Sequence, residues 1–143
     1  MLKKVLFICR GNACRSQMAE AFAKAYGEDI LEPYSAGIKP AGFVHSKVIT
    51  VMEEEGISLK GQTSKPVDPV LLSQMDWVIS LSQEAQKIFL SVPSSVHTEY
   101  WPVDDPTVVF GKEERILEAF RLTRDTIGER IKKLIQNLGG SVK

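Results

Sequence analysis

Short apolar runs along the chain predict strands. Residues 4–8 are rich in residues that favour strands and are almost entirely apolar, which predicts a strand that is buried on both faces. Three later runs have the same character. They predict further strands at residues 31–35, 77–81 and 96–101.

Between these runs, apolar residues recur three and four positions apart, which predicts helices with one buried face. The clearest pattern starts at Ile116 and ends at Leu138, before Gly139 and Gly140. Gly27 and Gly56 end two earlier patterns, as expected for helix termini. The expected helices lie at residues 18–27, 44–56, 67–75, 83–90 and 116–138.

The order of these elements predicts the fold class. Strands that alternate with helices favour an α/β protein, here a three-layer sandwich around a four-stranded parallel sheet. The length of 143 residues suits one domain, residues 1–143. Ligands of such folds bind beyond the carboxyl ends of the strands, and the first strand delivers Cys9 to that edge.

Composition and charge exclude several classes of protein. Lys+Arg and Asp+Glu number 18 each, and a net charge of zero argues against binding to nucleic acids or anionic membranes. Arg10 interrupts the first apolar run too early for a signal peptide, and no segment is long enough to span a membrane, so we expect a cytoplasmic protein. We also expect a monomer. The two histidines, His45 and His97, lack metal-ligand spacing, so no metal site is expected.

The segment from Cys9 to Ser16 carries the candidate chemistry. Between a strand and a helix, its N–H groups can form a nest for an anion, and Arg15 can bind two oxygens of that anion with its planar guanidinium group. The same positive field favours the thiolate of Cys9, and we expect the Ser16 hydroxyl both to donate to that sulfur and to cap the helix. The oxyanion-binding residues predicted here are Arg10, Gly11, Asn12, Ala13, Cys14, Arg15 and Ser16. The alternative is a core cysteine next to a surface arginine.

Residues 7–16 resemble the active-site loop of low-molecular-weight protein tyrosine phosphatases and of the arsenate reductases that share their fold. Residues 17–20 are more similar to the reductases, since the phosphatases usually have proline in place of Gln17. Residues 35–37, 56–57, 62–64 and 101–106 and the final helix also resemble the reductase pattern, so the similarity covers nearly the whole chain. It implies the low-molecular-weight phosphatase fold, a nucleophilic Cys9 and no bound cofactor.

The resemblance also implies a second catalytic group. Asp104 and Asp105 precede Pro106, and a carboxylic acid near the nucleophile can give a proton to the departing oxygen. From the residues alone, an Asp-Pro pair is equally typical of a plain turn. The family pattern assigns the general acid to the residue before the proline, which is Asp105.

The two activities of this family differ in the second step. A phosphatase uses water, whereas a reductase needs a second thiol, and thioredoxin-coupled reductases carry two further cysteines after the third strand. Residues 80–87 contain no cysteine. We therefore expect an external thiol, supplied by glutathione, mycothiol or a thioredoxin or glutaredoxin partner. Cys14 is the alternative source, although it is also interpreted as a small buried residue of the loop.

The phosphatase interpretation has its own difficulty. These phosphatases usually place aromatic residues directly after the Asp-Pro pair, where they enclose the phenol ring, but Thr107 and Val108 stand there. We therefore expect no wall for an aromatic phosphoester and favour arsenate reductase, with tyrosine phosphatase as the alternative. Arg15 and Asp105 argue against a sugar-transport phosphocarrier, which lacks the arginine. Lys65 is expected to face solvent, with replacement of a bound cation as the alternative.

Overall fold

A four-stranded sheet forms the centre of the computed structural model, which describes residues 1–143. All strands are parallel, in the order β2-β1-β3-β4. They are β1 (Lys3–Cys9), β2 (Leu31–Gly37), β3 (Trp77–Ser80) and β4 (His97–Tyr100). The predicted parallel α/β sheet is confirmed. Because β1 pairs with β2 on one side and β3 on the other, Cys9 at its end is flanked by the loops that follow both strands.

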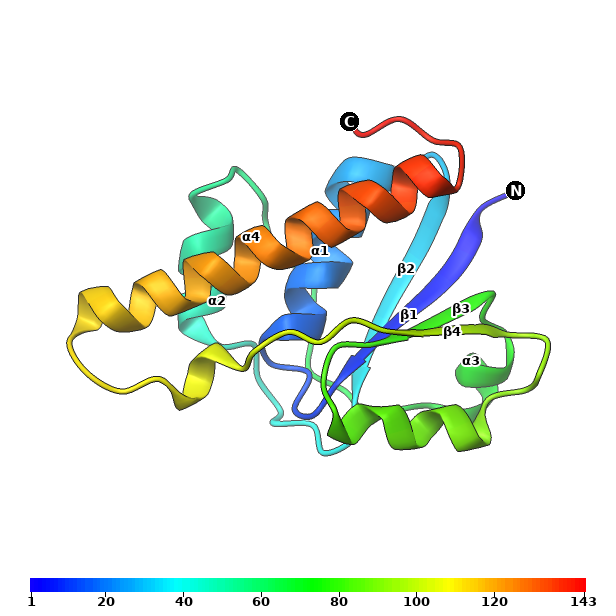
Figure 1. Ribbon diagram of the computed structural model, residues 1–143, viewed down its shortest axis with the longest axis horizontal. Helices are drawn as coiled ribbons and strands as arrows, with labels where there is room; N and C mark the ends of the chain where they lie inside the picture. The colour runs from blue at the N-terminus through cyan, green and yellow to red at the C-terminus, as the bar shows by residue number, and fades with distance from the viewer.

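Helices cover both faces of the sheet (Figure 1). They are α1 (Arg15–Gly27), α2 (Ser46–Glu53), α3 (Pro69–Ser73), α4 (Glu113–Asn137) and the 3₁₀ helices η1 (Glu84–Ser91) and η2 (Pro106–Val108). The helix expected at residues 83–90 is thus a 3₁₀ helix. Ala85 and Ile88 pack on the sheet from positions three residues apart, a spacing that fits three residues per turn. The helices are too short or too polar to cross a membrane.

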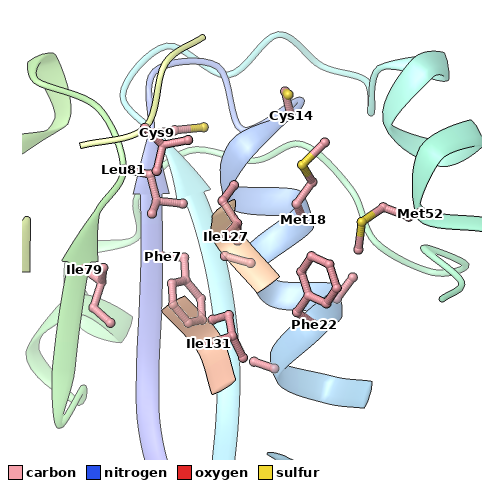
Figure 2. Packing of buried hydrophobic residues seen from close by; sticks show 14 of the residues in the cluster. Phe7, Cys9, Cys14, Met18, Phe22, Met52, Ile79, Leu81, Ile127 and Ile131 are labelled. Atoms are coloured by element: carbon pink, nitrogen blue, oxygen red, sulfur yellow. The ribbon is translucent and has the colours of Figure 1, made fainter. Parts of the chain in front are cut away.

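The two faces of β1 explain why its sequence is apolar throughout. Val5, Phe7 and Cys9 face the larger core, which α1, α2 and α4 build, whereas Leu6 and Ile8 face the smaller core under α3 and η1. Figure 2 shows Phe7 of the larger core near Ile127 and Ile131 of α4. Complete burial of such side chains stabilises the fold by about 1.5–3 kcal/mol each. The strand that carries Cys9 is therefore fixed by close packing on both of its faces.

Glu54, at the end of α2, links that helix to α4. Its carboxylate accepts hydrogen bonds from Arg121 Nε at 3.0 Å and from Arg124 Nη1 at 2.7 Å. The hydrogen bond from Arg121 is the main reason that the pKa of Glu54 falls to about 2, and the bond from Arg124 lowers it further. The periodicity of a single helix could not reveal this contact, because the partner lies on another helix.

The two tryptophans differ in burial. Trp101 follows β4, is buried, and packs on Phe7 with 6.0 Å between the ring centroids. Trp77 is only half-buried, because it lies at the start of β3 and stacks on the exposed His97 of β4 at 4.0 Å. Trp101 is thus a member of the larger core, and the partly buried Trp77 packs against that core.

Candidate active site

The loop between β1 and α1 has its backbone carbonyl groups turned away from its centre. Residues 38–45 donate to these carbonyls through four N–H groups: Ile38 to Cys9 (3.2 Å), Lys39 to Arg10 (2.8 Å), Ala41 to Gly11 (2.9 Å) and His45 to Ala13 (2.9 Å). The N–H groups of residues 10–16 donate to no acceptor within the protein. A row of free donors thus lies beside Cys9 and at the N-terminus of α1, where the helix dipole adds positive potential.

Asn12 holds this loop from beneath. It is fully buried and adopts a left-handed backbone conformation with φ of 47°. Its Oδ1 accepts from the N–H of Lys65 at 2.9 Å, so its Nδ2 must be the donor to Ser16 Oγ at 2.7 Å. Ser16 Oγ is 2.9 Å from Cys9 Sγ and, because it already accepts from Asn12, its own proton is free to donate to the sulfur.

The expectation that Ser16 caps α1 is wrong. The helix begins at Arg15, and Cys14 occupies the capping position without a side-chain hydrogen bond to the helix. A capping side chain would have occupied N–H groups of the first turn. Because Ser16 turns to Cys9 instead, those N–H groups remain available to an anion.

Arg15 closes the site from the side of the sheet. Its side chain is largely buried, and Nη1 donates to the carbonyl oxygen of Val103 at 3.0 Å and, at 3.4 Å, to that of Leu81. Leu81 directly follows β3, and Val103 follows β4 after the short segment 101–102. The strand ends therefore fix the guanidinium group, and Nη2 lies 3.7 Å from Asp105 Oδ2.

Asp105 lies at the start of η2, where its two carboxylate oxygens have different surroundings. Its Oδ1 accepts from the N–H and the hydroxyl of Thr107, at 2.9 and 2.6 Å, which is the turn expected of an Asp-Pro pair. Its Oδ2 makes no hydrogen bond and faces Arg15. Asp104 is exposed and does not line the site. A proton for a leaving group would therefore be carried by Oδ2 of Asp105.

One cavity of about 430 Å³ brings the predicted residues together. Cys9, Arg15 and Asp105 line it, as do four further predicted residues of the loop: Arg10, Gly11, Ala13 and Cys14. Asn12 and Ser16 do not line it, because they lie buried beneath the loop and support it through the hydrogen bonds described above.

Six residues of the cavity were not predicted as site residues: Lys39, Ala41, Phe43 and His45 after β2, and Thr107 and Val108 after Asp105. Lys39, Phe43 and His45 belong to the segment that follows β2 and that binds the carbonyls of the loop. Phe43 is more than half exposed at the cavity mouth, and Val108 after Asp105 also lines the cavity. The expectation that an aromatic ester finds no wall is therefore wrong. The available signal was the parallel order of β1 and β2, which places the loops after both strands at one edge.

His45 lies at the start of α2. It caps this helix, since its Nδ1 accepts from the N–H of Lys47 at 3.1 Å. Its ring also packs on Phe120, with 5.0 Å between centroids, and burial lowers its pKa. The ring is thus neutral at pH 7 and carries its proton on Nε2, which has no acceptor in the protein.

Lys65 lies behind the loop and does not simply face solvent, contrary to expectation. Its Nζ donates to the carbonyl of Thr63 at 2.8 Å and to Ser35 Oγ at 3.3 Å, and lies 3.7 Å from the buried carboxylate of Glu20. Burial lowers the pKa of Lys65. The lysine ammonium thus supplies a fixed positive charge at this position.

Cys14 lies at the start of α1, and its sulfur is drawn with that of Cys9 in Figure 2. Both cysteines are free thiols and both are buried. Burial, and next the neighbouring Cys9, raises the pKa of Cys14 well above its usual value. Cys14 is therefore protonated at neutral pH, in which form a thiol is a poor nucleophile.

Comparison with known proteins places this arrangement in a family. The family model for low molecular weight phosphotyrosine protein phosphatase matches residues 4–143. The chain belongs to this family. Curated relatives include arsenate reductases from Bacillus licheniformis, 41% identical with 94% of this chain and 96% of the relative covered, and from Halalkalibacterium halodurans, 42% identical with 92% and 95% covered.

Solved structures of the family include both branches. An arsenate reductase in its phosphate-binding state is 35% identical, with a TM-score of 0.75 and coverage of 95% of this chain and 98% of that one. A low molecular weight protein tyrosine phosphatase from T. tengcongensis is 26% identical, with a TM-score of 0.80 and coverage of 94% and 99%. The phosphatase fold expected from the sequence is confirmed.

Proposed function

We propose that this chain reduces arsenate to arsenite with an external thiol, through a covalent bond to Cys9. One observation carries the proposal: the loop of unpaired N–H groups beside Cys9 occurs in a chain that is 41–43% identical to arsenate reductases over more than nine-tenths of its length. The loop supports the binding of a tetrahedral oxyanion, and the similarity favours arsenate as that anion.

In the first step, the Cys9 thiolate attacks arsenic in line with an As–O bond. The N–H groups of the loop and the guanidinium group of Arg15 hold the remaining oxygens and stabilise the charge that develops on them. The departing oxygen takes the proton that Asp105 carries on Oδ2 and leaves as water. The product is a covalent adduct in which arsenic, still arsenic(V), is bonded to Cys9 Sγ.

In the second step, an external thiolate attacks Cys9 Sγ. An S–S bond forms, and the electron pair of the S–As bond stays on arsenic, which leaves as arsenite. A second thiol then reduces the disulfide and frees Cys9. Cys14 is ill suited to replace the external thiol, because burial keeps it protonated. Glutathione, mycothiol, or a thioredoxin or glutaredoxin partner could act in the reducing cytoplasm, where we place the protein.

Tyrosine phosphatase activity is the second candidate, and Phe43 favours it. A flat ring bound through its phosphate to the loop would pack between Phe43 and Val108, which both line the cavity. Water would then attack phosphorus in the phosphocysteine, and Asp105 would take a proton from that water. Because the first step is shared, we expect weak phosphatase activity even in an arsenate reductase.

The test is arsenite formation from arsenate by the purified protein, with the thioredoxin, glutathione–glutaredoxin and mycothiol systems supplied separately. Hydrolysis of p-nitrophenyl phosphate is measured in parallel. Arsenite formation with any thiol system supports the reductase, whereas ester hydrolysis without arsenite in any system supports the phosphatase. Cys9→Ser must abolish both activities, and any activity left in that variant contradicts the mechanism.

A further inference from the structure

The active-site cavity is larger than an oxyanion requires. A water molecule takes up about 30 Å³, so an anion with four oxygens needs roughly the space of four waters, about 120 Å³. The cavity holds about 430 Å³, within the range of sites for small organic ligands. Most of its volume therefore lies outside the loop and is available to a second molecule next to the bound anion.

We call this outer part of the cavity the outer subsite. It is lined by Lys39, Phe43, His45 and Val108. Phe43 and Val108 offer exposed apolar surface. Lys39 is exposed and has no carboxylate partner in the structure. His45 presents an unpaired Nε2–H donor. The outer subsite thus suits a ligand that has both an apolar part and a negatively charged or hydrogen-bond-accepting part.

Arg10 adds positive charge at the same cavity. Its guanidinium lies 3.7 Å from the carboxylate of Glu84, and both side chains are more than half exposed. An exposed pair at this distance contributes little energy and is easily exchanged for another partner. A carboxylate that enters the cavity therefore finds one free cation, Lys39, and one that is only weakly held, Arg10.

We propose that the outer subsite binds the reductant itself, as a small thiol that carries carboxylates, of the glutathione class. This inference rests on the proposed reductase function. The carboxylates of such a thiol pair with Lys39 and Arg10, its backbone packs on Phe43 and Val108, and its sulfur reaches Cys9. The outer subsite thus assigns the resolving thiol to a small molecule and not to a folded protein.

The burial of Cys9 supports the choice of a small thiol. Only 2% of this residue is exposed, and it lies between the loop and the side chains that line the cavity. A flexible thiol can enter a cavity of this volume together with the anion. A cysteine fixed on the surface of a folded partner would have to enter together with the surrounding surface of that partner, which a cavity of this volume cannot admit.

The reaction balances with two molecules of this thiol. The thiolate of the first attacks Cys9 Sγ, forms a mixed disulfide and leaves the electron pair of the S–As bond on arsenic. Its proton is taken up by Asp105, which gave its own proton to water in the first step. The second molecule attacks the mixed disulfide, which yields the free Cys9 thiolate and the oxidised thiol dimer.

The experiment measures arsenite formation at saturating arsenate with three reductants: glutathione, glutathione diethyl ester and 2-mercaptoethanol. The wild-type chain is compared with Lys39→Glu and with Lys3→Glu, which makes the same charge change at the opposite edge of the sheet. We expect Lys39→Glu to raise the KM for glutathione about five- to tenfold, because a weak attraction becomes a repulsion. We expect a smaller rise in KM with glutathione diethyl ester and 2-mercaptoethanol, which carry no carboxylate. Lys3→Glu should leave the KM of all three thiols unchanged.

Trapping provides the second measurement. Protein mixed with arsenate and one equivalent of glutathione, and then alkylated, should carry a single glutathionyl group on Cys9 by mass spectrometry. Turnover with thioredoxin alone but not with glutathione overturns the outer subsite and leaves the reductase intact. An equal effect of Lys39→Glu on all three thiols also overturns it. No arsenite with any reductant, alongside hydrolysis of p-nitrophenyl phosphate, overturns both the subsite and the proposed function.

Discussion

Replacement of Asn12 by alanine tests whether the loop depends on its buried support. The change removes two hydrogen bonds, to the Lys65 N–H and to Ser16 Oγ, each of which contributes about 1 kcal/mol to the free energy of unfolding. Alanine at φ of 47° costs about 1 kcal/mol more. The sum is about 3 kcal/mol, which should lower the Tm by about 6–12 °C in a chain of this size.

Urea unfolding followed by tryptophan fluorescence measures this change, with an unaltered m value as the check that the transition stays two-state. Asn12→Gly is the matched control, since glycine adopts this backbone freely and should lose only about 2 kcal/mol. We expect kcat/KM for p-nitrophenyl phosphate to fall about a hundredfold in both variants, because the Ser16 hydroxyl is no longer held toward Cys9. A loss below about 1 kcal/mol in Asn12→Ala, or unchanged kcat/KM, would refute this account of the loop.

Three further predictions concern groups around the site and the fold. Arg15→Lys keeps the charge but loses the planar group, so kcat/KM should fall about 10²- to 10³-fold in steady-state assays, and near wild-type activity would contradict its role. In Gly37→Ala the new Cβ would lie 2.9 Å from the Arg10 carbonyl oxygen and from the Asn12 N–H nitrogen, so thermal denaturation should show a loss of about 1–3 kcal/mol. The pKa of Glu54 is lowered in the folded state, so its stabilisation is present above about pH 4.5 and is lost as the pH falls toward about 2. Urea titrations between pH 5 and pH 2.5 should therefore show a shallower acid loss in Glu54→Gln than in the wild type, and parallel curves would contradict this.

The elements were predictable where local pattern decides them. The apolar run of β1 and the repeat of α4 predicted both elements within a few residues of their bounds. The ends of α2 and α3 differ by two or three residues each, because the expected helices at residues 44–56 and 67–75 include flanking turns and extended segments. The 3₁₀ geometry of η1 also escaped prediction, since periods of 3.0 and 3.6 residues are hard to distinguish over eight residues.

The loop was predictable because its chemistry lies in consecutive residues, whereas the rest of the cavity was not. Phe43 and His45 line the same cavity as Cys9 because β1 and β2 are parallel neighbours. Asp105 lines it because β4 ends at the same edge. The role of Lys65 depends on Glu20 and Ser35, which are distant in sequence and meet in the fold. Contacts of this kind have no local period or spacing from which to infer them.

The distinction between the two activities of the family must therefore lie outside the loop. In the proposed mechanism Cys9, Arg15 and Asp105 serve the first step of both reactions, and the second step depends on whether water or a thiol reaches the adduct. That choice depends on the surface around the adduct, which residues 38–45 and 105–108 supply. At this surface Lys39 supplies a positive charge and Phe43 an apolar contact. A phosphatase needs only the contact with an aromatic ring. A change confined to Lys39 should therefore alter thiol use more than ester hydrolysis, which is why substitution there separates the two activities more sharply than any change within the loop.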